Sequence, residues 1–257
     1  MPVPMMTNAA VDIYYEYHHH DDALPVILLS HGYSATAKMW QAQIAGLQQV
    51  ANIIVWDMRG HGRSASPDDQ AQYSEALTVS DMRALLAICG VKKAIIGGLS
   101  LGGYMALAFH YVHPEMCQAL MLFDTGPGYK SEAGREGWNR TAEARAVDLE
   151  TRGLAALGTG AEVQIAEHKT ATGLARAARG MLAQKDDRII QSLPGIAVPT
   201  LVLVGDRDEP FLVPTDYIVA KVPGAHKVVI KDAGHASNID QPAAFNAAVV
   251  SFVKSVG

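Results

Sequence analysis

Short, uninterrupted apolar runs recur along this chain, and stretches with helical spacing separate them. Continuous apolar runs of this length are typical of strands that are buried on both faces of a sheet. They cover residues 25–30, 52–57, 92–100, 118–124, 199–206 and 226–232. The helical patterns between them cover residues 38–49, 79–89, 101–113, 214–222 and 242–256. Because strand and helix alternate, we expect an α/β fold with a mostly parallel, twisted sheet and helices on both of its faces.

Two stretches depart from this rhythm. Residues 11–18 alternate between apolar and polar side chains, which predicts an edge strand or one arm of a hairpin. Residues 125–193 have no strand-like run, and a bare loop of that length is not expected in a compact domain. We therefore predict one core domain, made of residues 1–124 and 194–257, and a helical lid insertion of residues 125–193.

Composition narrows the class of protein. Of the 257 residues, 49% are apolar and 18% are charged, so a large core is expected. The formal charge of −5 argues against nucleic acid or an anionic membrane surface as a partner, because both select for a basic face. No apolar run approaches the ~20 residues of a membrane span, and the N-terminus lacks the pattern of a secretory signal. We read Cys89 and Cys117 as buried, reduced thiols, which predicts a cytoplasmic protein.

The sequence does not predict a metal site. The two cysteines lack the spacing of metal ligands. Three consecutive histidines occupy residues 18–20, but adjacent side chains at a strand end cannot all converge on one ion. We interpret these histidines as part of a solvated loop.

Glycines surround one serine at the point where an expected strand becomes an expected helix. The segment Gly98-Leu99-Ser100-Leu101-Gly102 reads G-x-S-x-G, the pattern of a sharp turn that exposes a nucleophilic serine. The residues two positions before and after the serine lie too close to the turn to carry side chains. An ordinary glycine-rich turn has the same pattern, so the role of Ser100 depends on its partners.

A serine nucleophile needs a general base, and the base needs an acid that fixes its tautomer. His235 follows the expected strand 226–232 and is our candidate base. Asp206 and Asp208 follow the preceding strand, and spacing alone does not choose between them as the acid. Asp124 ends an earlier strand and is a third candidate, although it would require an unusual placement.

These motifs resemble the α/β-hydrolase superfamily, in its branch of small esterases, enol-lactonases and C–C hydrolases. The order serine, aspartate, histidine along the chain is the order in that superfamily. The resemblance extends over nearly the whole chain, through the segments LLSHGYSAT, DMRGHGRS, GGLSLGG, LVLVGDRDEP and DAGHASNIDQP. This branch commonly has its aspartate three residues after a strand-end glycine, which implies Asp208 after Gly205. The resemblance also implies an oxyanion hole made by the backbone N–H groups of Tyr33 and Leu101.

The resemblance gives two further segments a structural role. His31 is expected to brace the turn after its strand. Residues 57–64 are expected to form a loop behind the site, with Asp57 and Arg59 bonded locally. This loop lacks the consecutive Lys-Ser/Thr pair of a phosphate-binding P-loop.

The combined pattern predicts a carboxylic ester hydrolase that acts on small to medium acyl esters or lactones through an acyl-enzyme on Ser100. The mechanism requires no metal or organic cofactor, and the expected partner is the small-molecule substrate. Three alternatives remain: C–C bond hydrolysis, a proton-abstracting lyase that uses the same residues, and a non-catalytic ligand sensor. Haloalkane dehalogenation is not expected, since that chemistry needs an aspartate in place of Ser100.

The expected lid carries the features that decide the substrate. An arginine facing the pocket would favour a substrate with a carboxylate. Acidic residues in the same interval nearly balance the arginines, which favours solvated helix faces with i,i+4 pairs instead. The arginines between residues 131 and 183 are Arg135, Arg140, Arg145, Arg152, Arg176 and Arg179. The expected apolar underside consists of Trp138, Leu154, Leu157, Leu174 and Met181.

Overall fold

The computed structural model describes residues 4–256 and contains one eight-stranded sheet. Its strand order is β1-β2-β4-β3-β5-β6-β7-β8. β1 (Met5–Asn8) and β2 (Val11–His18) form an antiparallel edge. The parallel strands are β3 (Val26–Ser30), β4 (Asn52–Trp56), β5 (Ala94–Leu99), β6 (Cys117–Phe123), β7 (Thr200–Gly205) and β8 (His226–Ile230). The predicted α/β fold with a mostly parallel sheet is confirmed.

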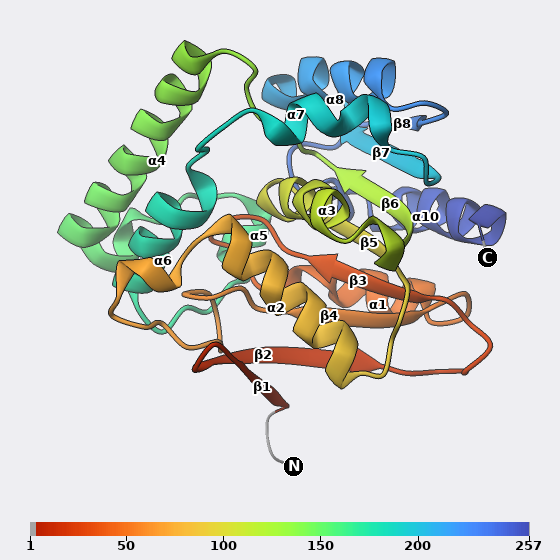
Figure 1. Ribbon diagram of the computed structural model, residues 1–257, viewed down its shortest axis with the longest axis horizontal. Helices are drawn as coiled ribbons and strands as arrows, with labels where there is room; N and C mark the ends of the chain where they lie inside the picture. Colours follow the sequence, from red (N-terminus) through yellow and green to blue (C-terminus); the bar gives the residue numbers. More distant parts are fainter. Residues whose placement is uncertain (1–3, 257) are drawn as a thin grey trace.

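Helices cover both faces of the sheet (Figure 1). One face packs against α1 (Gln41–Leu47) and α10 (Pro242–Val256), and the other against α2 (Glu75–Ile88), α3 (Leu101–Val112) and α8 (Glu209–Lys221). Successive strand residues alternate between the two cores. In β3, for example, Leu28 belongs to one apolar cluster and Ile27 and Leu29 to the other. This alternation is why the strands read as continuous apolar runs in the sequence.

Residues 125–193 are all described, and they contain helices but no strand. The helices are α4 (Glu132–Arg152), α5 (Ala161–Gln164), α6 (Ala171–Ala177) and α7 (Arg188–Ser192). Figure 1 shows α4 and α6 beyond the end of the sheet toward which the arrows of β3 and β6 point. The carboxyl ends of parallel strands are the usual place for a ligand site in an open α/β sheet.

Several element boundaries differ from the predictions. α8 begins at Glu209, not at Pro214, because Pro210 occupies its first turn, where a missing N–H costs little. α2 begins at Glu75, where the Ser74 hydroxyl caps the helix by accepting from the N–H of Leu77. The first helical pattern divides into a 3₁₀ turn, Ala37–Trp40, and α1. β1 and the short helix α9 (Ser237–Asp240) were not predicted.

The loop after β4 is bonded more widely than expected. Asp57 accepts hydrogen bonds from the N–H groups of Ala37 (2.7 Å) and Arg63 (2.8 Å). Arg59 is fully buried and forms a two-bond ion pair with Asp81 of α2, at 2.6 and 2.8 Å. The prediction that Arg59 is bonded within its own loop is therefore wrong, because its partner lies on α2, a helix that packs on one face of the sheet.

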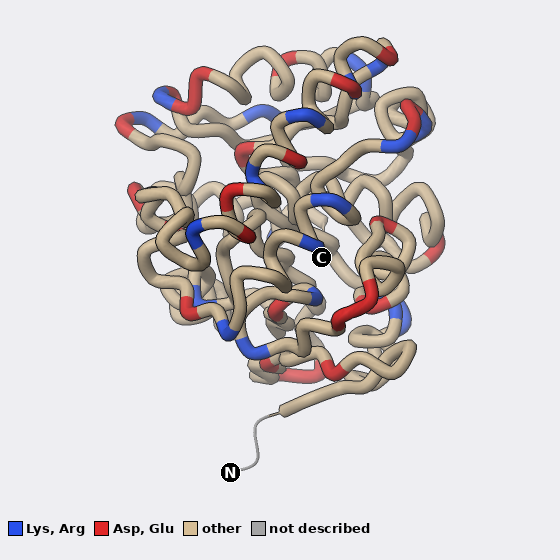
Figure 2. The backbone as a smooth tube through the Cα atoms, turned by 90° about the vertical axis from the view of Figure 1, so that its left-hand side faces the viewer, with Lys and Arg blue, Asp and Glu red and all other residues tan. Residues whose placement is uncertain are grey.

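Other features of the described residues concern charge, thiols and membranes. Acidic and basic residues are interspersed in the view of Figure 2. Both cysteines are free; Cys117 is buried, but Cys89 is only half-buried, contrary to the prediction. Within residues 4–256, no helix combines the length and apolarity needed to cross a bilayer. In the same range, no three or more His, Cys, Asp or Glu side chains are grouped so that they could hold a metal ion.

Candidate active site

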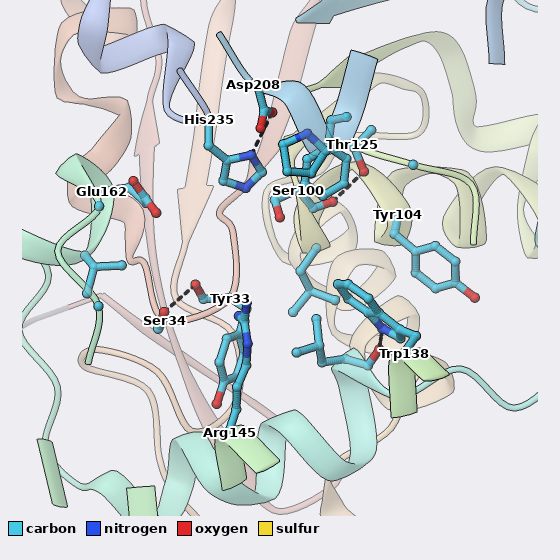
Figure 3. Close-up of a pocket in the computed structure, with 18 of the residues that line it drawn as sticks. Tyr33, Ser34, Ser100, Tyr104, Thr125, Trp138, Arg145, Glu162, Asp208 and His235 are labelled. Atoms are coloured by element: carbon cyan, nitrogen blue, oxygen red, sulfur yellow. Dashed lines mark hydrogen bonds and ion pairs between the residues drawn. The ribbon is translucent and has the colours of Figure 1, made fainter. Parts of the chain in front are cut away.

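Ser100 occupies the turn between β5 and α3. Its φ of 55° and ψ of −116° lie in a region that residues with side chains rarely adopt. Two hydrogen bonds hold this turn to the end of β6: the Ser100 N–H donates to the Phe123 carbonyl (2.9 Å), and the Thr125 hydroxyl donates to the Ser100 carbonyl (2.6 Å). The Ser100 side chain does not cap α3. Its hydroxyl instead lies at the cavity, beside the His235 ring (Figure 3).

The glycines on either side of Ser100 are required by close backbone packing. A Cβ on Gly102 would lie 2.1 Å from the carbonyl oxygen of Ser30, and one on Gly98 would lie 2.4 Å from the carbonyl carbon of Gly102. Neither position has room for a side chain. The backbones of β3, β5 and α3 therefore meet directly beneath the serine.

His235 and Asp208 are brought together from the loops that follow β8 and β7. The His235 Nδ1 and the Asp208 Oδ2 lie 2.8 Å apart, and Asp208 is buried. The ring of Phe211 stacks on His235 with a centroid distance of 4.8 Å. Burial alone would lower the pKa of His235, but the hydrogen bond and the charge of Asp208 outweigh it and raise that pKa above its ordinary value. Within the described residues no hydrogen bond joins Ser100 to His235; such bonds often tighten only when substrate binds.

The other two candidate aspartates have different partners. The side chain of Asp206 accepts a hydrogen bond from the N–H of Ala233 (3.3 Å), on the loop that leads to His235. Asp124 is buried, accepts from the N–H of Gly205 (2.8 Å), and binds the Ser237 hydroxyl. Burial raises the pKa of Asp124 to about 7, and its two hydrogen bonds limit that rise. Of the three, only Asp208 contacts the His235 imidazole.

Tyr33, in the loop after β3, and Leu101, after the turn that follows β5, both line the same cavity as Ser100. Leu101 is the first residue of α3, so its N–H has no acceptor within the helix. His31 does brace this turn: its Nδ1 donates to the Gly32 carbonyl (2.7 Å), and its Nε2 accepts from the Met58 N–H (2.9 Å). These bonds require a neutral imidazole, and burial lowers the pKa of His31 to about 4.

A histidine that the sequence analysis did not single out joins this loop to residues 125–193. His168 lies between α5 and α6; its Nε2 donates to the Ser34 carbonyl (2.9 Å), and its Nδ1 accepts from the Gly62 N–H (3.1 Å). The neighbouring Tyr33 hydroxyl donates to the Leu174 carbonyl (2.9 Å). Ser34 has a φ of 58°, so its backbone is also strained. The turn that follows β3 is thus held from the helical insertion on two sides.

Ser100, Asp208 and His235 face one cavity of about 690 Å³ (Figure 3). Its wall includes the predicted residues Ser100, Asp208, His235, Tyr33 and Leu101. The charged residues Arg145, Asp148 and Glu162 also line it, and none of them was predicted as a site residue. Their placement depends on how the helical insertion folds over the sheet, for which the sequence pattern carries no direct signal.

The predicted apolar underside of the insertion is right only in part. Trp138 and Leu157 line the cavity. Leu174 and Met181 are buried in the larger apolar core. Leu154 is 38% exposed, so its prediction is wrong: it lies in a short turn after α4 that faces solvent.

Comparison with known proteins places the chain in a family. The family described as "Alpha/beta hydrolase family" matches residues 26–248. The 3-oxoadipate enol-lactonase 1 of Acinetobacter baylyi is 27% identical over 90% of each chain. A putative 2-succinyl-6-hydroxy-2,4-cyclohexadiene-1-carboxylate synthase of Bacillus subtilis is 25% identical, over 91% of this chain and 92% of that one. Among solved structures, a thermophilic esterase from Thermogutta terrifontis, with malate bound, superimposes with a TM-score of 0.81 at 27% identity, covering 99% of this chain and 97% of the esterase. The chain therefore belongs to the α/β hydrolase family.

Proposed function

We propose that this protein is a serine hydrolase that cleaves carboxylic esters, either small to medium acyl esters or lactones. The observation that carries the proposal is the hydrogen-bonded pair of His235 and the buried Asp208, which faces the same cavity as the strained Ser100. Hydrolase relatives, among them an enol-lactonase and an esterase, support the same class of reaction. We keep residues 125–193 as the proposed lid, since helices from this segment form part of the cavity wall.

In the proposed mechanism, the Ser100 hydroxyl attacks the ester carbonyl while the Nε2 of His235 accepts its proton. Asp208 holds the Nδ1–H and stabilises the imidazolium that forms. The N–H groups of Tyr33 and Leu101 donate to the oxyanion, and the N-terminus of α3 adds positive potential there. His235 then protonates the leaving alcohol. Next, His235 accepts a proton from a water molecule that attacks the acyl carbonyl, and it returns that proton to the Ser100 oxygen as the acyl–oxygen bond breaks and the carboxylic acid leaves. All the catalytic groups in this scheme are side chains or N–H groups of the chain itself.

The test is the Ser100→Ala variant. We expect it to keep the melting temperature of the wild type, to lose hydrolysis of p-nitrophenyl butyrate, and to lose the mass increase that a fluorophosphonate leaves on the wild type. Undiminished turnover by the variant would remove Ser100 from the mechanism.

A second candidate function is a proton-abstracting lyase or C–C hydrolase that uses the same three residues. The similarity to a putative synthase in Bacillus subtilis favours keeping it. A lyase of this kind would react with fluorophosphonates but would not turn over a panel of simple esters and lactones. A chain that neither reacts with fluorophosphonates nor cleaves these esters and lactones would instead be a ligand sensor.

The two free thiols favour a reducing compartment, and we propose the cytoplasm.

A further inference from the structure

Among the described residues, two charged side chains of the cavity, Arg145 and Glu162, form no hydrogen bond or ion pair, and Arg145 is the basic one. Trp138, Arg145, Asp148 and Leu149 all line the cavity from α4. Spacings of seven, ten and eleven residues place them on one face of the helix. Arg145 is therefore on the side of α4 that faces the cavity, and it is exposed enough to meet a ligand.

The other arginines of this segment differ from Arg145. Every other arginine in residues 132–192 binds a carboxylate or a backbone carbonyl: Arg135 (Tyr129 and Lys130 carbonyls), Arg140 (Glu136), Arg152 (Asp148), Arg176 (Asp68), Arg179 (Glu143 and Glu150) and Arg188 (Glu75 and Asp186). Among the described residues, Arg145 has no hydrogen bond or ion pair. Its guanidinium carbon lies 5.9 Å from the centroid of the Tyr33 ring, near the outer limit of a cation–π interaction.

The acidic residues of the cavity do not neutralise Arg145. Asp148 is held by both nitrogens of the Arg152 fork, and Asp208 is bound to His235. Glu162 lies beside His235, whereas Arg145 lies against Tyr33 (Figure 3). No ion pair joins Glu162 to Arg145 within the described residues. The part of the cavity next to Tyr33 therefore carries an uncompensated positive charge.

We propose that Arg145 binds a carboxylate of the substrate, so that the preferred substrate is an ester or lactone with a free carboxylate elsewhere in the molecule. This rests on the proposed ester hydrolysis at Ser100. A guanidinium presents paired N–H donors that match the two oxygens of a carboxylate. Arg145 lies over the ring of Tyr33, whose N–H is the proposed oxyanion donor, and both residues line the cavity that contains Ser100, so one substrate in that cavity would contact both. The two contacts would fix its orientation in the cavity.

The experiment compares esters that differ only in charge. Monomethyl succinate, glutarate, adipate and pimelate are paired with analogues in which the free carboxylate is a primary amide, such as methyl 5-carbamoylpentanoate for adipate. Hydrolysis is followed by proton release in a pH-stat. For at least one length, we expect the wild type to favour the charged ester in kcat/KM by about tenfold, the value of one charge-assisted hydrogen-bonded pair. Arg145→Gln should abolish that preference, and Arg145→Lys should keep part of it.

Arg140→Gln is the matched control, since Arg140 lies on α4, is paired with Glu136 and does not line the cavity. It should keep the wild-type preference. Binding is measured separately by titrating monomethyl adipate into Ser100→Ala, with and without Arg145→Gln. If both esters of every pair are cleaved through Ser100 with equal kcat/KM, and Arg145→Gln changes no ratio, the carboxylate site is refuted while the ester hydrolase stands. If no ester is cleaved, the proposed function is refuted, and the binding titration then tests the carboxylate site by itself: equal affinity with and without Arg145→Gln would refute that site.

Discussion

His168 offers the sharpest test of whether residues 125–193 support the proposed active site. Its two nitrogens bind the Ser34 carbonyl and the Gly62 N–H, and Ser34 follows the proposed oxyanion donor, Tyr33. His168→Ala removes both hydrogen bonds. Each is worth about 1 kcal/mol, and the orphaned groups add to the cost, so we expect the free energy of unfolding to fall by about 2–3 kcal/mol. A chain of this length should then melt roughly 5–10 °C lower.

The same change should also slow catalysis. A misplaced donor stabilises the oxyanion less, so we expect kcat for p-nitrophenyl butyrate to fall roughly 10- to 100-fold while KM changes little. A trifluoromethyl ketone reports on this directly, because it forms a tetrahedral adduct on the serine. Its inhibition constant should rise by the same factor as kcat falls, whereas the affinity for the butyrate product should hardly change.

His20→Ala is the control for the general loss of an imidazole, since His20 is exposed in the loop after β2. His168→Gln, whose amide has both a donor and an acceptor, should recover part of the lost kcat. If His168→Ala loses stability but keeps both kcat and the inhibition constant of the ketone, the histidine only holds the insertion in place. The coupling between insertion and oxyanion loop would then be wrong.

Two further predictions concern protonation and a buried charge. His235 must be neutral to accept a proton, and Asp208 raises its pKa. As the pH is lowered, kcat/KM should therefore begin to fall at a pH above the ordinary histidine value of 6.5. Asp208→Asn should shift this acidic limb of the pH profile to lower pH and reduce kcat by about 10²- to 10⁴-fold. Asp81→Ala leaves the fully buried Arg59 without its carboxylate and should lower the free energy of unfolding by about 3–5 kcal/mol in urea titrations, whereas Glu136→Ala, at an exposed pair, should leave the urea midpoint unchanged.

The fold was predictable because parallel strands that are buried on both faces leave a signal in the sequence. Five of the strands from β3 to β8 lie within one of the apolar runs, and β6 begins one residue before its run, at Cys117. The failures occurred where the signal is short or ambiguous. β1 has four residues and one buried side chain, too few for a pattern. The start of α8 was also missed: the predicted helical pattern begins at residue 214, although the helix contains Pro210 in its first turn and Pro214 in its interior.

In the candidate site, too, the residues marked by a local sequence motif could be predicted, and those placed by tertiary packing could not. The glycines around Ser100 lie within five consecutive residues, so the sequence pattern could indicate the turn, although the contacts that require them include the backbone of β3. Arg145 and His168 could not be singled out, since both belong to the insertion and acquire their surroundings only when it folds over the sheet. Arginine count and charge balance describe the insertion as a whole, and they do not distinguish Arg145 from arginines that are fully paired.

The sequence offered three aspartates as the partner of His235, and in the structure each of them forms different hydrogen bonds. Asp208 binds the imidazole, Asp206 binds the N–H of Ala233, and Asp124 joins Gly205 to the Ser237 hydroxyl. Together these carboxylates tie the turn after β7 to the loop after β8 at three points. Spacing could not choose among them because all three lie at the carboxyl ends of neighbouring strands. Of the three, only Asp208 is hydrogen-bonded to the His235 imidazole, so we expect only its loss to change the protonation of His235 through a direct contact.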